Sequence, residues 1–254
     1  MRTVRTVTEL RAALESSPEV GLVPTMGAFH DGHLSLIRAA RAESETVVVS
    51  LFVNPAQFAE AADLDRYPRD EERDAEVAEA EGVDVLFAPR VEELYPPGFQ
   101  TWVDVEKLSR GLEGAARPGH FRGVATICLK LFSIVRPRRA YFGQKDAQQV
   151  AVVKRLVRDL ELGIEIRVVP TVRDADGLAL SSRNAYLSPD ERERALALPR
   201  ALATRDAERA RELLAGLDVD YVAVADFDPP VLAAAVRVGA TRLIDNVLLE
   251  GEEE

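Results

Sequence analysis

The sequence predicts an α/β fold, an open parallel sheet with helices that is followed by a smaller α+β region. Through roughly the first 172 residues, short apolar runs alternate with helical patterns, and this alternation is typical of βα units around a parallel sheet. From Leu187 the chain becomes helical and rich in Ala, Arg and Glu, and two strand-like runs follow. We therefore expect a larger domain over residues 1–172 and a small C-terminal domain over residues 173–254.

The strands of the larger domain are predicted from runs of apolar, β-branched residues, which are typical of buried parallel strands. These runs lie at residues 21–25, 46–53, 83–89, 139–143 and 164–170. Two similar runs, at 220–227 and 241–249, predict strands in the C-terminal domain.

The helices are predicted between these strands from the spacing of apolar residues. The patterns lie at residues 34–43, 69–82 and 148–163. The last two patterns end on Gly82 and Gly163, and glycine is the residue that most readily ends a helix in a left-handed conformation.

Composition excludes several classes of protein. With 47% apolar and 30% charged residues among 254, the chain has the balance of a globular protein. No apolar run approaches the roughly 20 residues of a membrane helix, and the first residues lack the apolar segment of a signal peptide, so we expect a cytoplasmic protein that does not bind membranes. The single cysteine, Cys128, is expected to be a buried apolar residue.

The charge of the chain also limits its partners. A net charge of -11 repels a phosphate backbone and argues against nucleic-acid binding. The basic cluster at 136–139 is expected to be a solvated loop, and the acidic tail at 250–254 is expected to be frayed.

Polar segments follow four of the predicted strands directly. They lie at residues 26–33, 54–58, 143–149 and 171–184. Since ligands of open parallel sheets bind outside the carboxyl ends of the strands, we expect these segments to face one crevice.

The first of these segments favours an anion. Gly27 and Gly32 permit a tight turn, and the helix that follows would present unpaired N–H groups and the positive end of its dipole. His30 and His33, three residues apart, could both donate hydrogen bonds to a phosphate as charge develops on it.

Two other interpretations of the histidine pair stay open. The segment could be a structural turn, or the pair could bind a metal ion. For a metal site the chain offers few further ligands beyond carboxylates, since His120 and Cys128 are the only other histidine and cysteine.

Two further segments add groups suited to a phosphate chain. Ser181, Ser182 and Arg183 bring two hydroxyls and a guanidinium together, although a serine here could equally cap a helix. Lys145 stands out because the chain has 28 arginines and only four lysines, so this position could require a compact ammonium group, or could be a lysine by chance.

Neutral amides indicate the second reactant. Gln57 and Gln149, together with Asn54, could form a polar pocket that holds a small carboxylic acid without neutralising it. An acid bound in this way keeps its nucleophilic character.

Six blocks of the sequence resemble the motifs of a known family. The blocks PTMGAFHDGH, FVNPAQF, DLDRYPRD, ARPGHFRGV, YFGQKDAQQ and DGLALSSRNAYLS are similar, in order and spacing, to those of the pantothenate synthetase (pantoate–β-alanine ligase) family. The first block carries the HxGH-type turn that nucleotidylyltransferases and class I aminoacyl-tRNA synthetases share.

The resemblance implies an ATP-dependent ligase with Mg²⁺ as cofactor. Pantoate would attack the α-phosphorus of ATP to give pantoyl adenylate and pyrophosphate, and β-alanine would then displace AMP to form pantothenate. It also implies a Rossmann-like N-terminal domain, a smaller C-terminal lid domain and a homodimer.

The resemblance also assigns residues, by their match to the family motifs. His33, His30 and Lys145 would be catalytic, with His33 as proton donor. Gln57 and Gln149 would hold pantoate, with Gln57 also near β-alanine, while the metal ligands stay unassigned. The ATP site would comprise Met26, Gly27, Ala28, Phe29, His30, Asp31, Gly32, His33, Gly143, Gln144, Lys145, Asp146, Val172, Leu180, Ser181, Ser182 and Arg183.

One departure from the family and two rival functions stay open. About 31 residues separate Ser188 from the strand-like run at 220–227, which is shorter than the family pattern and predicts a trimmed C-terminal domain. The rivals are a nucleotidylyltransferase that adenylates a phosphate ester, and a nucleotide sensor without turnover. A nucleotidylyltransferase would require further cations at the positions of Gln57 and Gln149. A nucleotide sensor would leave the two glutamines and the histidine pair without a function.

Overall fold

The structure is a computed structural model that describes residues 1–17, 19–58 and 61–249. The acidic tail at 250–254 lies outside the described residues. By its internal contacts the chain divides into two compact units. The first unit comprises Met1–Phe29, His33–Phe142 and Val152–Val169, and the second comprises His30–Gly32, Gly143–Ala151 and Pro170–Glu254. The division into domains 1–172 and 173–254 stays a prediction, because neither unit is one continuous segment.

The first unit is built on a six-stranded sheet with the order β1-β4-β3-β2-β5-β6. The strands are β1 (Arg2–Val4), β2 (Val20–Thr25), β3 (Thr46–Leu51), β4 (Val85–Phe87), β5 (Arg139–Gly143) and β6 (Glu165–Val169). The pairings of β1 with β4, β4 with β3, β3 with β2 and β2 with β5 are parallel. The predicted open parallel sheet is confirmed, and each of the five apolar runs overlaps a strand. The three residues of β1 are too few to form a recognisable pattern.

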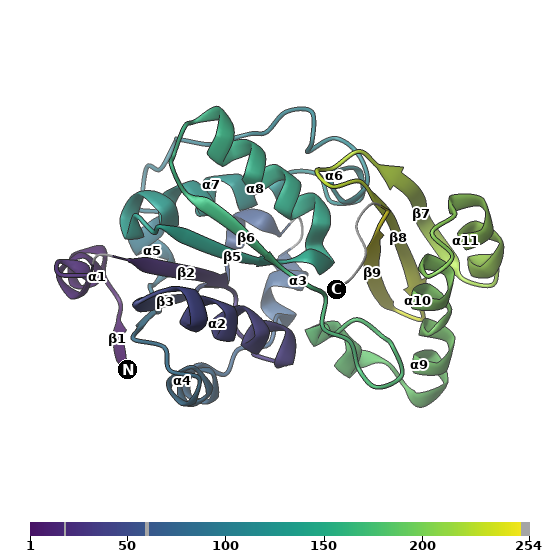
Figure 1. The fold of residues 1–254 in the computed structure, drawn as a ribbon, viewed down its shortest axis with the longest axis horizontal. Coiled ribbons are helices and arrows are strands. Elements are labelled where there is room, and N and C mark those ends of the chain that lie inside the picture. Colours follow the sequence, from purple (N-terminus) through teal and green to yellow (C-terminus); the bar gives the residue numbers. More distant parts are fainter. Residues whose placement is uncertain (18, 59–60, 250–254) are drawn as a thin grey trace. The chain divides into compact units, whose positions relative to one another are not determined.

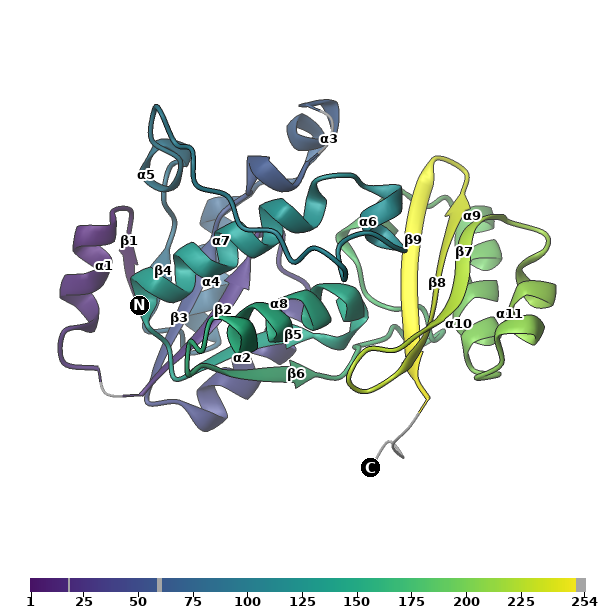
Figure 2. The ribbon, with the colours of Figure 1, turned by 90° about the horizontal axis from the view of Figure 1, so that it is seen from above.

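Helices cover both faces of this sheet, as Figures 1 and 2 show. On one face lie α2 (Asp31–Glu43) and α4 (Glu71–Ala80), and on the other lie α7 (His120–Val135) and the later turns of α8 (Ala147–Asp159). Ile37 of α2 and Ala78 of α4 pack with Val23 and Val49 of the sheet in one apolar core. The rest of the first unit comprises α1 (Val7–Leu14), the 3-10 helix η1 (Pro55–Gln57), α3 (Ala61–Arg66), α5 (Val91–Leu94) and α6 (Glu113–Ala116).

Helix α7 was not predicted from the sequence. Ten of its sixteen residues are buried. Among them Phe121, Val124 and Cys128 are spaced three and four residues apart, as on one face of a helix, so the sequence did carry a signal for this helix. Cys128 lies on α7 and is buried, as expected, and this burial raises the pKa of its thiol to about 12. None of the described helices is long and apolar enough to cross a membrane.

The second unit contains an antiparallel sheet of β7 (Asp218–Ala225), β8 (Val231–Val238) and β9 (Thr241–Leu248), in that order. Its helices are α9 (Pro189–Ala195), α10 (Ala197–Leu202) and α11 (Ala207–Leu214), and two 3-10 helices, η2 (Gln144–Asp146) and η3 (Ser182–Tyr186), also belong to it. Strand β8 was not predicted, because its three consecutive alanines hide the alternation of a strand.

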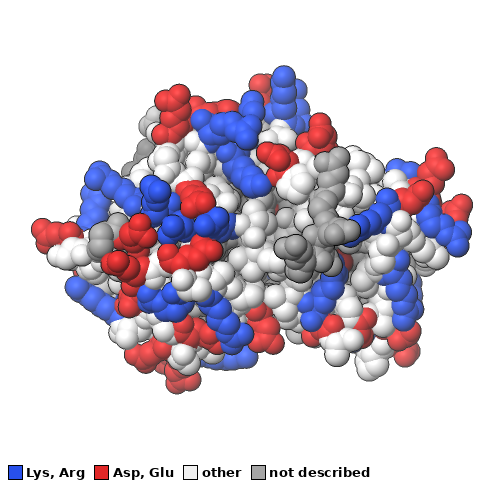
Figure 3. Space-filling view, viewed as in Figure 1, with Lys and Arg blue, Asp and Glu red and all other residues white. Residues whose placement is uncertain are grey.

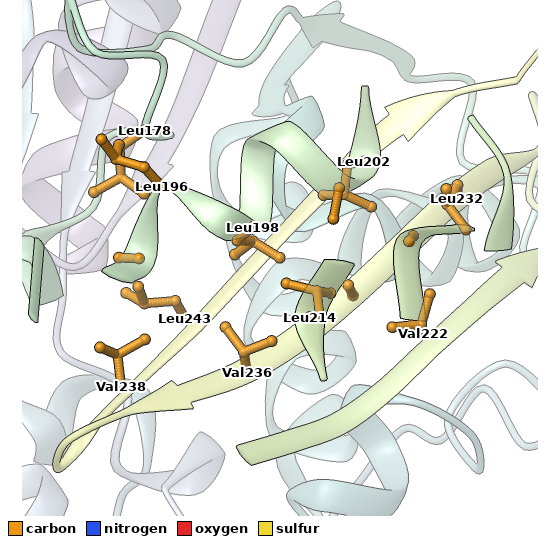
Figure 4. Packing of buried hydrophobic residues seen from close by; sticks show 14 residues of the cluster. Leu178, Leu196, Leu198, Leu202, Leu214, Val222, Leu232, Val236, Val238 and Leu243 are labelled. Atoms are coloured by element: carbon orange, nitrogen blue, oxygen red, sulfur yellow. The ribbon is translucent and has the colours of Figure 1, made fainter. Parts of the chain in front are cut away.

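The core of the second unit lies between these helices and one face of the sheet, as Figure 4 shows. Leu232 and Val236 point from the same face of β8, as residues an even number apart in a strand do. They pack with Leu198 of α10 and Leu214 of α11. Leu243 of β9, the edge strand of the small sheet, packs in this apolar core. The core therefore fixes the position of β9, to which the segment at 144–145 is hydrogen-bonded.

Acidic and basic side chains are interspersed on the face shown in Figure 3. Arg139 is an example of a basic side chain that forms ion pairs with acidic neighbours. The expectation of a solvated loop at 136–139 is wrong for this residue, because Arg139 begins β5 and only 19% of its side chain is exposed. Its guanidinium lies 3.2 Å from Glu165 and 3.4 Å from Glu19.

Candidate active site

The segment after β2 makes a tight left-handed turn before α2 begins. Gly27 and Ala28 have positive φ angles of 88° and 54°. At Gly27 a side chain could not be accommodated, because a Cβ atom would lie 2.7 Å from both Asp74 Oδ2 and Leu51 Cδ1. The two left-handed residues turn the chain sharply between the end of β2 and Phe29.

Three N–H groups of this segment have partners within the protein. The N–H groups of Ala28 and Phe29 each donate to a carboxylate oxygen of Asp74, at 2.8 Å. The Gly32 N–H donates to His30 Nδ1 at 3.1 Å. The expectation that the following helix presents unpaired N–H groups is therefore wrong for Gly32, which lies in α2. Ala28 and Phe29 precede the helix, and their partner Asp74 is a functional candidate that sequence reasoning missed.

His30 is held in one tautomer and is kept neutral. Because its Nδ1 accepts the Gly32 N–H, the proton of the neutral ring lies on Nε2, where it can be donated. Burial, and to a lesser extent the positive charge of Lys145, lower the pKa of His30 below its ordinary value. Both residues belong to the second unit, which therefore combines a neutral hydrogen-bond donor with an ammonium group.

His33 belongs to the first unit and packs on an aromatic ring. Its imidazole lies 5.6 Å from the ring of Phe29, centroid to centroid, at an angle of 44°. Phe29 itself is only 6% exposed, so a buried ring supports one side of the imidazole.

A pocket in the second unit brings together three of the predicted phosphate-binding residues. Lys145, Ser181 and Arg183 line it, and Asp245 contributes to the same wall. The Lys145 ammonium lies 3.6 Å from the carboxylate of Asp146. A lysine, a hydroxyl and a guanidinium are groups that bind phosphate oxygens, and here they line one small cavity of about 10 Å³.

The segment that carries Ser181 is fixed by its own hydrogen bonds. Leu180 N–H donates to the Val172 carbonyl at 2.9 Å, which places these two predicted residues side by side. Ser181 Oγ accepts the Arg183 N–H at 3.3 Å and caps η3. The capping role that sequence analysis left open is therefore present, and it orients the hydroxyl at the start of η3.

Strand β9 holds the segment that carries Lys145. The amide of Asn246 donates to the carbonyls of Gln144 and Lys145, at 3.0 and 2.9 Å, and accepts from Gln144 Nε2 at 2.9 Å. Its neighbour Asp245 is buried and pairs with Arg173 at 2.7 Å. Sequence reasoning missed both residues, although an acid and an amide in the middle of an apolar strand are an unusual pattern.

In the first unit, Gln57 lies at the centre of a network of amides. Gln57 Nε2 donates to the sulfur of Met26, and its Oε1 accepts from Asn54 Nδ2 at 3.1 Å. The Gln57 backbone carbonyl lies 2.9 Å from His120 Nδ1. Gly123 allows α7 to pass close to η1, because a Cβ there would lie 2.3 Å from the Ala56 carbonyl oxygen.

Asn54 uses its full hydrogen-bonding capacity within the protein. Its Nδ2 donates to Gln57 and to the Gly123 carbonyl, and its Oδ1 accepts from the Tyr95 hydroxyl and the Ala56 N–H. An amide has two N–H groups and two acceptor positions, and Asn54 is 1% exposed. We therefore expect Asn54 to orient Gln57 and not to contact a ligand itself.

The two glutamines of the predicted pocket lie in different units. Gln57 belongs to the first, while Gln149 lies in α8, in the part assigned to the second. Gln149 is partly exposed. Within residues 1–17, 19–58 and 61–249, no group of three or more His, Cys, Asp or Glu side chains could hold a metal ion.

Comparison with known proteins settles the family. A sequence profile described as pantoate-beta-alanine ligase matches residues 2–248. The chain belongs to the pantoate–β-alanine ligase family. A pantothenate synthetase from Roseiflexus castenholzii is 53% identical over 277 residues, which cover 98% of this chain and all of the relative. One from Moorella thermoacetica is 52% identical over 280 residues, which cover 98% of this chain and 99% of the relative.

Solved structures agree with the sequence comparison. The crystal structure of pantothenate synthetase from Thermus thermophilus has a TM-score of 0.93 at 47% identity, over 99% of this chain and all of the other. Pantoate–β-alanine ligase from Francisella tularensis, complexed with beta-gamma ATP and β-alanine, has a TM-score of 0.89 at 35% identity, over 99% of both chains. The resemblance seen in the motifs, the predicted fold class and the predicted ligase function are confirmed.

Proposed function

We propose that the chain joins pantoate to β-alanine in two steps at the expense of ATP. A pantoate carboxylate oxygen attacks the α-phosphorus of ATP, and the bond to pyrophosphate breaks. The amino group of β-alanine then attacks the acyl carbon of pantoyl adenylate, and AMP leaves with the oxygen that pantoate supplied. The observation that carries this proposal is the match of residues 2–248 to the ligase family, and it is supported by the convergence of Lys145, Ser181 and Arg183 on one small cavity.

The second unit supplies the proposed phosphate contacts. Lys145 and Arg183 neutralise phosphate oxygens, and the Ser181 hydroxyl donates to one of them. His30, neutral because of its lowered pKa, donates from Nε2 to an oxygen that gains negative charge as pyrophosphate leaves. The remaining predicted ATP contacts, Met26–His33, Gly143–Asp146, Val172, Leu180 and Ser182, stay part of the proposal.

The first unit supplies His33 and the proposed acid pocket. His33, supported by the Phe29 ring, is assigned as a proton donor to the phosphate chain. Gln57 holds the pantoate carboxylate through an amide N–H, with Asn54 fixing the orientation of Gln57. Gln149 is assigned to pantoate as well. Neutral amides suit this task because they leave the carboxylate charge available for attack.

Mg²⁺ is proposed only as the partner of ATP. The described residues offer no cluster of three acidic, histidine or cysteine ligands, so they do not form a metal cage of their own. Mg²⁺ accepts phosphate oxygens and water as most of its ligands, and no step above passes through a protein-bound metal. A homodimer and a cytoplasmic location also stay part of the proposal, and sedimentation of the purified protein tests the first.

Exchange of labelled pyrophosphate into ATP tests the first step. With ATP and pantoate present and β-alanine left out, the proposal predicts exchange that depends on pantoate. Exchange that requires a phosphate ester instead would favour a nucleotidylyltransferase. Nucleotide binding without any exchange would favour a sensor, and either result would refute the ligase.

A further inference from the structure

Asp74 is an acid in the apolar core of the first unit. It lies on α4, one turn before Ala78 and on the same buried side, and it is 2% exposed. A buried carboxylate is costly unless hydrogen bonds compensate its charge. The partners found for this one are the N–H groups of Ala28 and Phe29, which bind its two oxygens separately at 2.8 Å.

The turn that binds Asp74 has the geometry of an anion site. Gly27 and Ala28 are both left-handed, and the N–H groups of Ala28 and Phe29 point to one carboxylate. Successive N–H groups in such turns form concave sites for anions. In this chain the protein's own carboxylate occupies that site, so these two N–H groups are already engaged before any nucleotide binds.

The contacts continue from Asp74 to a proposed proton donor. Asp74 fixes the backbone of Phe29, and the Phe29 ring packs against the imidazole of His33 at 5.6 Å. All three residues belong to the first unit. A change in the Phe29 backbone would therefore move the surface that supports His33.

We propose that Asp74 is a positioning residue, which fills the anion site of the turn at 27–29 and thereby sets the orientation of the His33 imidazole for adenylate formation. The proposal rests on the proposed ligase function. It also implies that ATP phosphates are held by side chains and by other N–H groups, and that the N–H groups of Ala28 and Phe29 take no part in binding them.

The variant Asp74→Asn tests the proposal with little change in shape. Asparagine offers one oxygen and one NH₂ group, so one of the two backbone N–H groups would face another donor in a buried place. Asp70→Asn is the matched control, because Asp70 caps the same helix through the Arg73 N–H and asparagine caps helices equally well.

Pantoate-dependent pyrophosphate exchange is measured for both variants at a temperature where circular dichroism shows them folded. We expect kcat of Asp74→Asn to fall at least about 10-fold, since small misplacements of catalytic groups have effects of this order, while the KM for pantoate stays within about twofold. Asp70→Asn should match the unaltered protein. Equal kcat values in all three proteins, or equal losses in both variants, would overturn the proposal.

Hydrogen exchange of the unaltered protein gives a second measurement that needs no variant. The proposal predicts that the N–H groups of Ala28 and Phe29 exchange slowly without nucleotide, and that ATP leaves their rates unchanged. Rapid exchange that slows only on addition of ATP would overturn it. If the unaltered protein shows no pantoate-dependent exchange of pyrophosphate into ATP, the ligase function fails. The hydrogen-exchange rates of the Ala28 and Phe29 N–H groups still decide, in that case, whether Asp74 occupies the turn.

Discussion

Removal of the Asn246 side chain should loosen the segment that carries Lys145. In Asn246→Ala, the carbonyls of Gln144 and Lys145 and the Nε2 of Gln144 lose their partner. Each of these three hydrogen bonds contributes about 1 kcal/mol net, and Asn246 is only 4% exposed, so little water reaches the groups left behind. The free energy of unfolding should therefore fall by about 3 kcal/mol.

The matched control for Asn246→Ala is Ser188→Ala. Ser188 caps α9 in the same unit, through the Glu191 N–H, and has no contact with η2 in the hydrogen bonds described. Loss of such a cap costs about 1 kcal/mol. It destabilises the second unit without touching the Lys145 segment.

Two measurements separate the effects of Asn246→Ala. Urea unfolding gives the loss of stability, and pyrophosphate exchange gives the KM for ATP at a temperature where both variants are folded. We expect the ratio kcat/KM for ATP to fall at least about 10-fold in Asn246→Ala and to stay unchanged in Ser188→Ala. If the two variants have the same exchange kinetics, Asn246 does not hold Lys145 in place for the reaction.

Three further predictions follow from the site. His33→Ala should lower the exchange rate about 10²-fold, the usual effect of removing one donor to a transition state, and an unchanged rate would remove His33 from the mechanism. Lys145→Arg should exchange more slowly although its charge is kept, because a guanidinium is larger and binds in a different geometry; full activity would show that any cation suffices. Burial and the Lys145 charge lower the pKa of His30, so its neutral form persists below pH 6.5 and activity that depends on it should be lost only as the pH falls further. Replacement of Lys145 by Met should raise the pKa of His30 in an NMR titration, and no change would contradict the assigned electrostatic effect.

The sequence predicted elements well where local pattern and environment agree. The apolar runs that became β2 and β3 are short, rich in β-branched residues and buried, and parallel strands are buried on both faces. Helix α7 was missed although its buried Phe121, Val124 and Cys128 follow helical spacing. Strand β8 was missed because its alanines carry no alternation of apolar and polar residues.

The residues that position the site were much harder to predict than those that form it. Lys145, Ser181 and Arg183 stand out by chemical type, and one pocket contains all three. Asp74 looked like one more acid in a charged helix, and its partners lie 45 and 46 residues away. Asn246 binds a segment about 100 residues away. The only local signal for either residue is a polar group at a position where the periodicity calls for an apolar one.

The fate of the pantoate oxygens tests the central claim most directly. Pantoate labelled with ¹⁸O in both carboxylate oxygens is converted with ATP and β-alanine, and AMP and pantothenate are analysed by mass spectrometry. Attack of the carboxylate on the α-phosphorus predicts one labelled oxygen in AMP and one in the amide carbonyl of pantothenate. AMP without label, or label in inorganic phosphate, would contradict the adenylate route.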